Sequence, residues 1–263
     1  MTSQSEKIPK TRLGFVANLG IALLALAGTI TMQWTQLNRS SISNLTPSQL
    51  DQQEAQRLKL LNQLPTLGFD NLIANLTFLN FIQYFGDNDV RSETGYATSV
   101  NYFDVITQRD PRFIEIYPFL TTAISYYAGK PEITIKFIDR GTNVISPEKQ
   151  PQAYLVWVYK ALDQLLLLGD IPGAIHSYEM AIKWVAGTSA ADAGPFYQQS
   201  VNFLKKDPDS TQARFLGWSQ VYYQSVDKYP KERAKQELLK LGAKMQTTPD
   251  GEVHFILPQS KMK

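Results

Sequence analysis

The amino-acid sequence predicts an all-α fold of consecutive helix pairs behind one apolar N-terminal helix. Long apolar runs with helical spacing stop at Gly86, Gly129 and Gly169, roughly 40 residues apart, and each run is followed by a second helical run. Glycine ends a helix at low cost because it adopts the left-handed conformation without a side-chain clash. Residues 13–32 form a separate apolar run without a charged side chain.

Residues 13–32 are long enough to cross a membrane as a helix. At ~1.5 Å per residue, about 20 residues span the ~30 Å hydrocarbon core. Lys7, Lys10 and Arg12 precede this run, whereas only Arg39 follows it closely. Because cytoplasmic flanks carry the excess of basic residues, we expect a cytoplasmic tail at 1–12, a transmembrane helix at 13–32 and export of everything that follows.

A cleaved signal peptide is the alternative for the same segment. Ala25-Leu26-Ala27 has the small residues of a cleavage site, after a basic start and a shorter apolar stretch. The apolar run continues beyond Ala27 to Met32, which favours an uncleaved anchor. Both alternatives export the rest of the chain.

The composition excludes several classes of function. The chain has 26 basic and 24 acidic residues, a net charge of +2 and no cysteine. The balanced charge is evidence against a nucleic-acid partner. The lack of thiols excludes disulfides, thiolate nucleophiles and cysteine zinc sites, and only His176 and His254 remain as imidazole ligands or bases. We therefore expect no cofactor, no metal and no small-molecule substrate.

The remaining enzymatic alternative is a hydrolase that uses carboxylates. Asp104, Asp110 and Glu115 lie close together in the sequence. Each of them also fits a helix cap or a solvated surface, and no P-loop, dinucleotide glycine pattern, HExxH or GxSxG motif accompanies them. The sequence therefore favours a non-enzymatic protein.

A polar linker at 33–45 leads to the first helix of the folded domain. Thr46-Pro47-Ser48-Gln49 forms a capping box, with threonine at the cap, proline at the first helical position and glutamine three residues after the cap. Asp70 begins the apolar helix that ends at Gly86, and we expect residues 87–94 to form a loop. The predicted helices that follow are 96–108, 113–127, 131–145, 154–168 and 171–186.

The C-terminal part continues the helical pattern over 195–206, 212–226 and 231–241. We expect the second of these runs to stack as a further first helix, with Ser225 in place of the turn glycine. The last helix would then cover the end of the stack with a polar face. Residues 243–263 form a tail with a short apolar, extended part at 251–258.

The pair at 154–186 has the clearest signature. Its first helix stops at Gly169, and Ala174, Tyr178 and Ala181 then place two small residues and one ring on a single face of the second helix. In order and spacing, these four residues resemble the second half of a tetratricopeptide repeat (TPR). The first half departs from the repeat at Val158, Ala161, Leu162 and Leu165. The domain 46–242 therefore resembles a divergent TPR-like solenoid of helical hairpins.

This resemblance implies a groove lined by the first helices of the pairs. In the repeat family, groove residues lie about ten, six and two to three positions before the turn glycine, on the concave surface. The corresponding protein-binding groove of this chain is lined by Leu76, Asn80, Tyr84, Phe119, Ala123, Tyr126, Tyr127, Tyr159, Asp163 and Leu167. The set lacks the basic clamp with which some members hold a terminal carboxylate, so a charged peptide end is not the expected ligand.

The segments LGFDNLIANLTFLNFIQYFGD and DVITQRDPRFIEIYPF also resemble membrane-anchored repeat-like proteins common in cyanobacteria. This second resemblance covers residues 67–186 and implies a thylakoid lumen or a periplasm. We therefore expect a membrane-anchored scaffold or adaptor that binds one or more proteins of a membrane complex. A permanent subunit and a transient assembly factor for a photosynthetic or envelope complex are both open at this point.

Overall fold

A computed structural model describes residues 10–40, 45–206, 208–247 and 253–258. The chain divides into two compact units, Met1–Thr46 and Pro47–Lys263. Residues 1–9 of the predicted basic tail, residues 41–44 of the linker and parts of the C-terminal tail lie outside the described residues.

The first unit contains one helix, α1 (Lys10–Ser40), which includes the whole predicted span. Its side chains are described for residues 18–34, and all of these are exposed. The side chains at the start of the predicted span, residues 13–17, lie outside this described part. Among the described residues, no helix has both the length and the apolar character that a membrane crossing requires.

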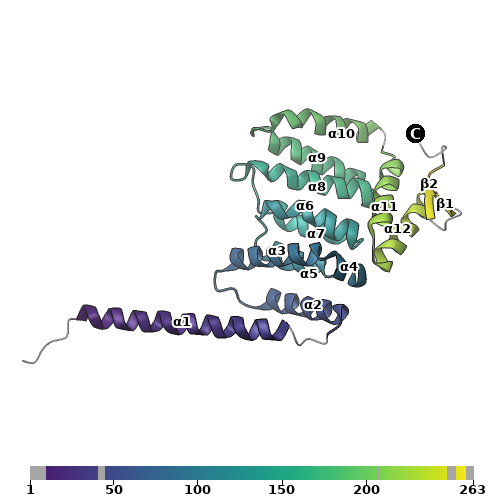
Figure 1. The fold of residues 1–263 in the computed structure, drawn as a ribbon. Coiled ribbons are helices and arrows are strands. Elements are labelled where there is room, and N and C mark those ends of the chain that lie inside the picture. The colour runs from purple at the N-terminus through teal and green to yellow at the C-terminus, as the bar shows by residue number, and fades with distance from the viewer. Residues whose placement is uncertain (1–9, 41–44, 207, 248–252, 259–263) are drawn as a thin grey trace, which may run out of the picture. The chain divides into compact units, whose positions relative to one another are not determined.

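The second unit confirms the prediction of an all-α fold with packed antiparallel helix pairs (Figure 1). Together with α1, the described part of the chain contains twelve α-helices, several of which begin or end in short 3₁₀ or π segments, labelled η. In chain order the elements of the second unit are α2 (Pro47–Gln63), α3 (Asp70–Gly86), α4 (Asn88–Thr94), α5 (Ser99–Arg109), η1 (Ile114–Ile116), α6 (Tyr117–Leu120), η2 (Thr121–Tyr127), α7 (Pro131–Thr142), η3 (Pro151–Ala153), α8 (Tyr154–Asp163), η4 (Gln164–Leu168), α9 (Ile171–Val185), η5 (Ala191–Ala193), α10 (Gly194–Lys206), α11 (Thr211–Gln224), α12 (Lys228–Lys240), β1 (Lys244–Thr247) and β2 (Val253–Ile256).

The helices from α2 to α10 are stacked, with α2 at one end and α10 at the other (Figure 1). Helix α3 pairs with α5, the α6–η2 segment with α7, and α8 with α9, while α10 packs on α9. The main core lies inside this stack and includes Phe81, Phe103, Ile116 and Ile124, all fully buried. Burial of one face of each helix, rather than helix propensity, supplies most of the stability of such a stack.

Two of the three predicted turn glycines adopt the left-handed conformation. Gly129 has φ of 64° and Gly169 has φ of 67°. In both turns the residue after the glycine donates its N–H to a carbonyl six residues earlier, at 2.9 Å: Lys130 to Ile124 and Asp170 to Gln164. This bond spans one residue more than in a Schellman motif, because both helices end in a π segment, η2 and η4.

The expectation for Gly86 was wrong. Helix α3 runs through Gly86, and the side chain of Asp87 then caps α4 by accepting a hydrogen bond from the Val90 N–H at 3.3 Å. The expected loop at 87–94 is therefore mostly helix α4. The glycine with positive φ in this pair is Gly95, with φ of 70°, but its ψ of −159° differs from the left-handed helical conformation.

Helices α11 and α12 form a C-terminal layer that crosses the turn ends of the stacked helices (Figure 1). Helix α11 packs against η2 and η4, so the expectation that it stacks as a further first helix was wrong. The contact is close, because a Cβ atom at Gly129 would lie 2.7 Å from Pro230 and one at Gly169 would lie 2.8 Å from Arg214. These two glycines thus satisfy both a backbone and a space requirement.

The tail predicted to be extended is confirmed as β2. It pairs with β1 in an antiparallel hairpin in which Met245 faces Phe255. The ring of Phe255 packs against Tyr222 of α11, with 4.9 Å between ring centroids. The hairpin is therefore attached to the C-terminal layer.

Candidate protein-binding surface

Helix α3 is apolar on both of its faces. Its inner face buries Ala74, Thr77, Phe81 and Tyr84 at spacings of three and four residues. A surface helix of a globular protein usually shows one apolar stripe and a polar opposite face. The opposite face of α3 is instead occupied by leucines.

We call the exposed residues Phe69, Leu72, Leu76 and Leu79 the α3 stripe. Their exposed fractions are 60%, 52%, 52% and 59%. The leucines recur at spacings of four and three, and the stripe lies opposite the buried face. Single exposed leucines are normal on protein surfaces, but a contiguous row marks an interaction site.

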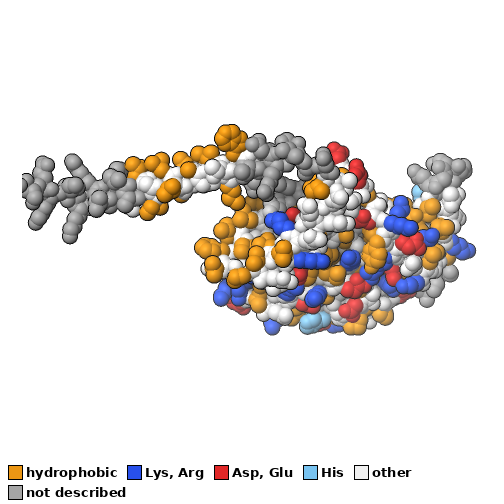
Figure 2. All heavy atoms as spheres, turned by 90° about the horizontal axis from the view of Figure 1, so that it is seen from below, with side chains coloured by type: hydrophobic (Ala, Val, Ile, Leu, Met, Phe, Trp, Pro, Cys, Tyr) orange, Lys and Arg blue, Asp and Glu red, His pale blue; other side chains and the backbone are white. Residues whose placement is uncertain are grey.

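The exposed apolar surface continues beyond the stripe. The ring of Phe119, from α6, is 38% exposed and packs edge-on against Phe78 of α3, with 5.2 Å between ring centroids. Leu64 and Leu67, between α2 and α3, are also exposed. Figure 2 shows hydrophobic side chains gathered at the end of the second unit where Figure 1 places the α2–α3 connection.

The α3 stripe has amide neighbours and almost no charge. The one charged residue of α3 is Asp70 in its first turn, which forms an ion pair with Arg109 at 3.4 Å. Asn75, Asn80 and Gln83 are exposed beside the stripe. This surface can therefore form hydrogen bonds without presenting a net charge.

A polar cleft of about 370 Å³ borders the same surface, between α2, α3 and α5. It is lined by Glu54, Arg57, Asn80, Gln83, Tyr84, Asp87 and Tyr102. The Tyr102 hydroxyl donates to Glu54 at 2.6 Å, and Arg57 forms an ion pair with the same carboxylate at 2.6 Å. Burial alone would raise the pKa of Glu54, but the hydrogen bonds from Arg57 and Tyr102 lower that pKa below its ordinary value.

The groove residues predicted on α3, which are Leu76, Asn80 and Tyr84, are only partly exposed. Leu76 and Asn80 are exposed, on the stripe and in the polar cleft respectively. Tyr84 is buried, and its hydroxyl donates to the carbonyl of Gly95 at 3.4 Å. The guanidinium of Arg91 lies 3.9 Å from the centre of the same ring, so Tyr84 belongs to the packing between α3, α4 and α5.

The groove residues predicted on the α6–η2 segment, which are Phe119, Ala123, Tyr126 and Tyr127, are partly covered by other side chains. Phe119 is exposed, whereas Ala123 is buried. Tyr127 is half-buried and packs on Tyr96, with 4.5 Å between ring centroids. Tyr126 is half-buried against the cluster formed by Leu167 and the C-terminal layer, and burial raises its pKa to about 12.

The groove residues predicted on α8 and η4, which are Tyr159, Asp163 and Leu167, lie almost entirely inside the protein. Tyr159 is half-buried against the main core, while Asp163 and Leu167 are 1% exposed. The backbone carbonyl of Leu167 accepts a hydrogen bond from the Trp218 indole N–H at 2.9 Å. The structure thus leaves Leu76, Asn80 and Phe119 accessible, and it packs the residues near Gly129 and Gly169 against other helices.

The sequence-based set did not include Phe69, Leu72 and Leu79. The signal that identifies them is a second apolar row at helical spacing in residues 69–79, which the groove positions of a repeat family do not take into account.

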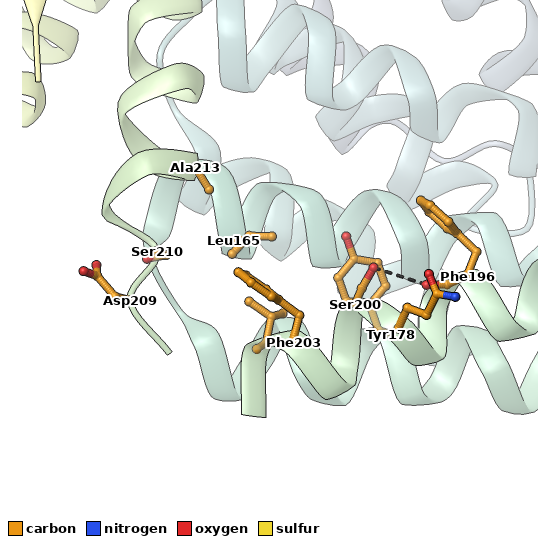
Figure 3. A pocket seen from close by; sticks show the side chains of 10 residues that line it. Leu165, Tyr178, Phe196, Ser200, Phe203, Asp209, Ser210 and Ala213 are labelled. Carbon is orange, nitrogen blue, oxygen red and sulfur yellow. Dashed lines mark hydrogen bonds between the residues drawn. The ribbon is translucent and has the colours of Figure 1, made fainter. Parts of the chain in front are cut away.

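A second hollow, of about 300 Å³, lies beside α10 (Figure 3). Its apolar walls are formed by Leu165, Tyr178, Phe196, Phe203 and Leu204, and Asp209, Ser210 and Ala213 lie at the start of α11. Phe196 and Phe203 are 66% and 62% exposed. The pocket is therefore open and could hold one apolar side chain of a partner.

The acids and histidines considered for catalysis take part in hydrogen bonds and packing within the fold or lie exposed on its surface. Asp104 accepts hydrogen bonds from Asn62 at 2.8 Å and from Arg140 at 2.7 Å. Asp110 accepts one from the backbone N–H of Arg112, and Glu115 is exposed. His176 packs edge-on against Trp157, and His254 lies on β2.

Comparison of the chain with protein families, with curated proteins and with solved structures gives no match.

Proposed function

We propose that this chain is a non-enzymatic, membrane-anchored scaffold of TPR-like helix pairs that binds protein through the α3 stripe. The single observation that supports this function is that α3 is apolar on both faces while only one face has a partner within the described residues. A second apolar row on a helix whose first apolar face is already buried is typical of an interaction site.

The stripe can contribute substantially to a complex. Full burial of a leucine side chain contributes about 1.5–3 kcal/mol, and each leucine of the stripe retains about half of its surface in water. Several such side chains in one row form a contiguous apolar patch of the kind that marks a protein-binding surface.

The proposed surroundings follow from the N-terminal segment. The uncharged run at 13–32 lies within α1, and a basic flank precedes it. We propose that this run anchors the chain, with residues 1–12 in the cytoplasm and the helix pairs on the exported face, in a thylakoid lumen or a periplasm. The polar segment 33–45 then gives the domain room above the bilayer.

Replacing Leu72, Leu76 and Leu79 together by glutamine tests this function. Glutamine is a good helix former, so we expect the melting temperature to change little while proteins that co-purify with the tagged full chain from membranes are lost. The matched control replaces Leu216 and Leu239 of the C-terminal layer, which are 61% and 46% exposed, by glutamine. Equal co-purification with the parent and the triple variant would show that the α3 stripe is not the binding surface.

The same membrane preparation distinguishes a permanent subunit from a transient assembly factor. A partner present in equal amounts throughout the isolated complex indicates a permanent subunit, whereas association only with incomplete complexes indicates an assembly factor.

A further inference from the structure

We propose that the partner of the α3 stripe is a second copy of this chain, with the two α3 helices packed antiparallel about a two-fold axis near Leu76. This inference rests on the proposed function, because it assumes that the stripe binds protein.

The exposed face of α3 is compatible with its own copy. A two-fold interface places the same patch on both partners, so charged side chains at its centre would often face like charges. From Asn71 to Gln83, α3 contains no charged residue. Its apolar stripe can therefore pack on an identical stripe without electrostatic repulsion.

The amides beside the stripe favour a protein over a lipid surface. Asn75, Asn80 and Gln83 each carry two donors and one acceptor oxygen. Asn75 lies one residue from the proposed axis, so the Asn75 amides of the two copies can form a hydrogen bond with each other. In contact with acyl chains, these amides would be left without hydrogen bonds, which costs free energy. Helices that lie on membranes also carry lysine and arginine beside their apolar face, and α3 has neither.

The spacing of the stripe suggests the antiparallel arrangement. Phe69 lies two helical turns before Leu76 and Gln83 lies two turns after it. With a two-fold axis at Leu76, Leu72 of one copy lies close to Leu79 of the other. The macrodipoles of the two helices then also point in opposite directions.

The size of the surface predicts a weak dimer. A standard interface involves roughly 20–30 residues on each side, and the exposed face of α3 with Phe119 provides fewer. The proposed anchor confines the copies to one membrane, which raises their effective concentration. We therefore expect pairing in the membrane and little pairing in dilute solution.

Single cysteines test the arrangement, because the chain has none of its own. Leu76→Cys, Leu72→Cys, Leu79→Cys and the control Leu216→Cys are introduced separately into the full chain. Each variant is reconstituted alone into lipid vesicles and oxidised, and covalent dimers are measured on a gel. A pair of Leu72→Cys and Leu79→Cys chains with different tags is treated in the same way.

We expect Leu76→Cys to form several-fold more dimer than Leu216→Cys. The mixed pair should form several-fold more heterodimer than Leu72→Cys forms homodimer. Equal dimer formation at positions 76 and 216 would overturn the pairing of two copies. Strong homodimer formation by Leu72→Cys would overturn the antiparallel arrangement.

The two proposals can fail separately. If Leu76→Cys stays monomeric while the triple glutamine variant loses its co-purifying proteins, the stripe binds another protein and only the self-pairing is wrong. If neither experiment shows an effect, both proposals are wrong.

Discussion

At the scale of single residues, Asp163 is an acidic side chain buried inside the second unit. It is 1% exposed, and the Ser125 hydroxyl donates to its Oδ2 at 2.6 Å. That hydroxyl also lies 2.7 Å from Oγ1 of Thr134. Burial raises the pKa of Asp163 to about 7, against the lowering effect of the hydroxyl hydrogen bonds. A carboxyl group that titrates near neutral pH therefore lies between α7, η2 and α8.

Asp163 makes the stability of the fold depend on pH. Because its pKa in the folded state is higher than the ordinary value of 3.8, the folded state binds more protons than the unfolded state between these two values. The stabilisation is fully present below about pH 4 and is lost as the pH rises through about 7. Asp163→Asn removes this dependence, so the variant should gain stability relative to the parent, by on the order of a few kcal/mol between pH 5 and pH 8.

Urea unfolding of the parent and of Asp163→Asn at pH 5, 6, 7 and 8 measures this difference. Hydrogen bonds lower the pKa of Glu54 and Glu132, so these groups change stability at lower pH, and they are common to both proteins. Two parallel pH profiles would contradict the assignment to Asp163.

At the scale of elements, the C-terminal layer decides which surfaces of the helix pairs stay open. Trp218 is 1% exposed, and its indole N–H donates to Leu167 at 2.9 Å. A Cβ atom at the neighbouring Gly217 would lie 2.6 Å from the Leu166 carbonyl oxygen, so α11 lies directly on η4. The layer thus covers the turn end of the predicted groove and leaves the outer face of α3 uncovered.

Trp218→Ala tests whether the layer is an integral part of the fold. We expect a loss of about 3–5 kcal/mol in the free energy of unfolding, because a large buried ring and one hydrogen bond are removed. Tyr223→Ala on the same helix is the control, since its ring is 55% exposed and its loss should cost much less. Similar unfolding curves for the two variants would show that α11 does not pack on η4 in solution.

At the scale of the whole molecule, the proposed topology places the two units in different surroundings. A reporter that is active only outside the cytoplasm, fused after Lys263, should be active, because in the proposed topology the basic residues Lys7, Lys10 and Arg12 lie on the cytoplasmic side. The same reporter fused before Met1 should be inactive. The reverse pattern would refute the topology, and a mature N-terminus at Gly28 would replace the anchor by a cleaved signal peptide.

The sequence by itself determined most of the helices, although not α4, and many of their boundaries to within a few residues. The signals are local: proline at the start of α2 and α7, Asp170 before α9, and glycine after η4. Each acts through backbone conformation or through a cap within one turn, so it can be read without the rest of the chain. The prediction of a left-handed turn at Gly86 failed because the next residue, Asp87, caps the short helix α4, which follows directly.

Only the tertiary structure decided which helices lie beside one another and which faces remain exposed. Helix α11 has the pattern of a further stacked helix, but it packs on η2 and η4, and this choice depends on contacts between residues far apart in the chain. The burial of Asp163 and the exposure of the α3 stripe follow from the same arrangement. Helical spacing in the sequence indicates that two faces of α3 are apolar. Only the tertiary packing determines which of these faces is buried against other helices.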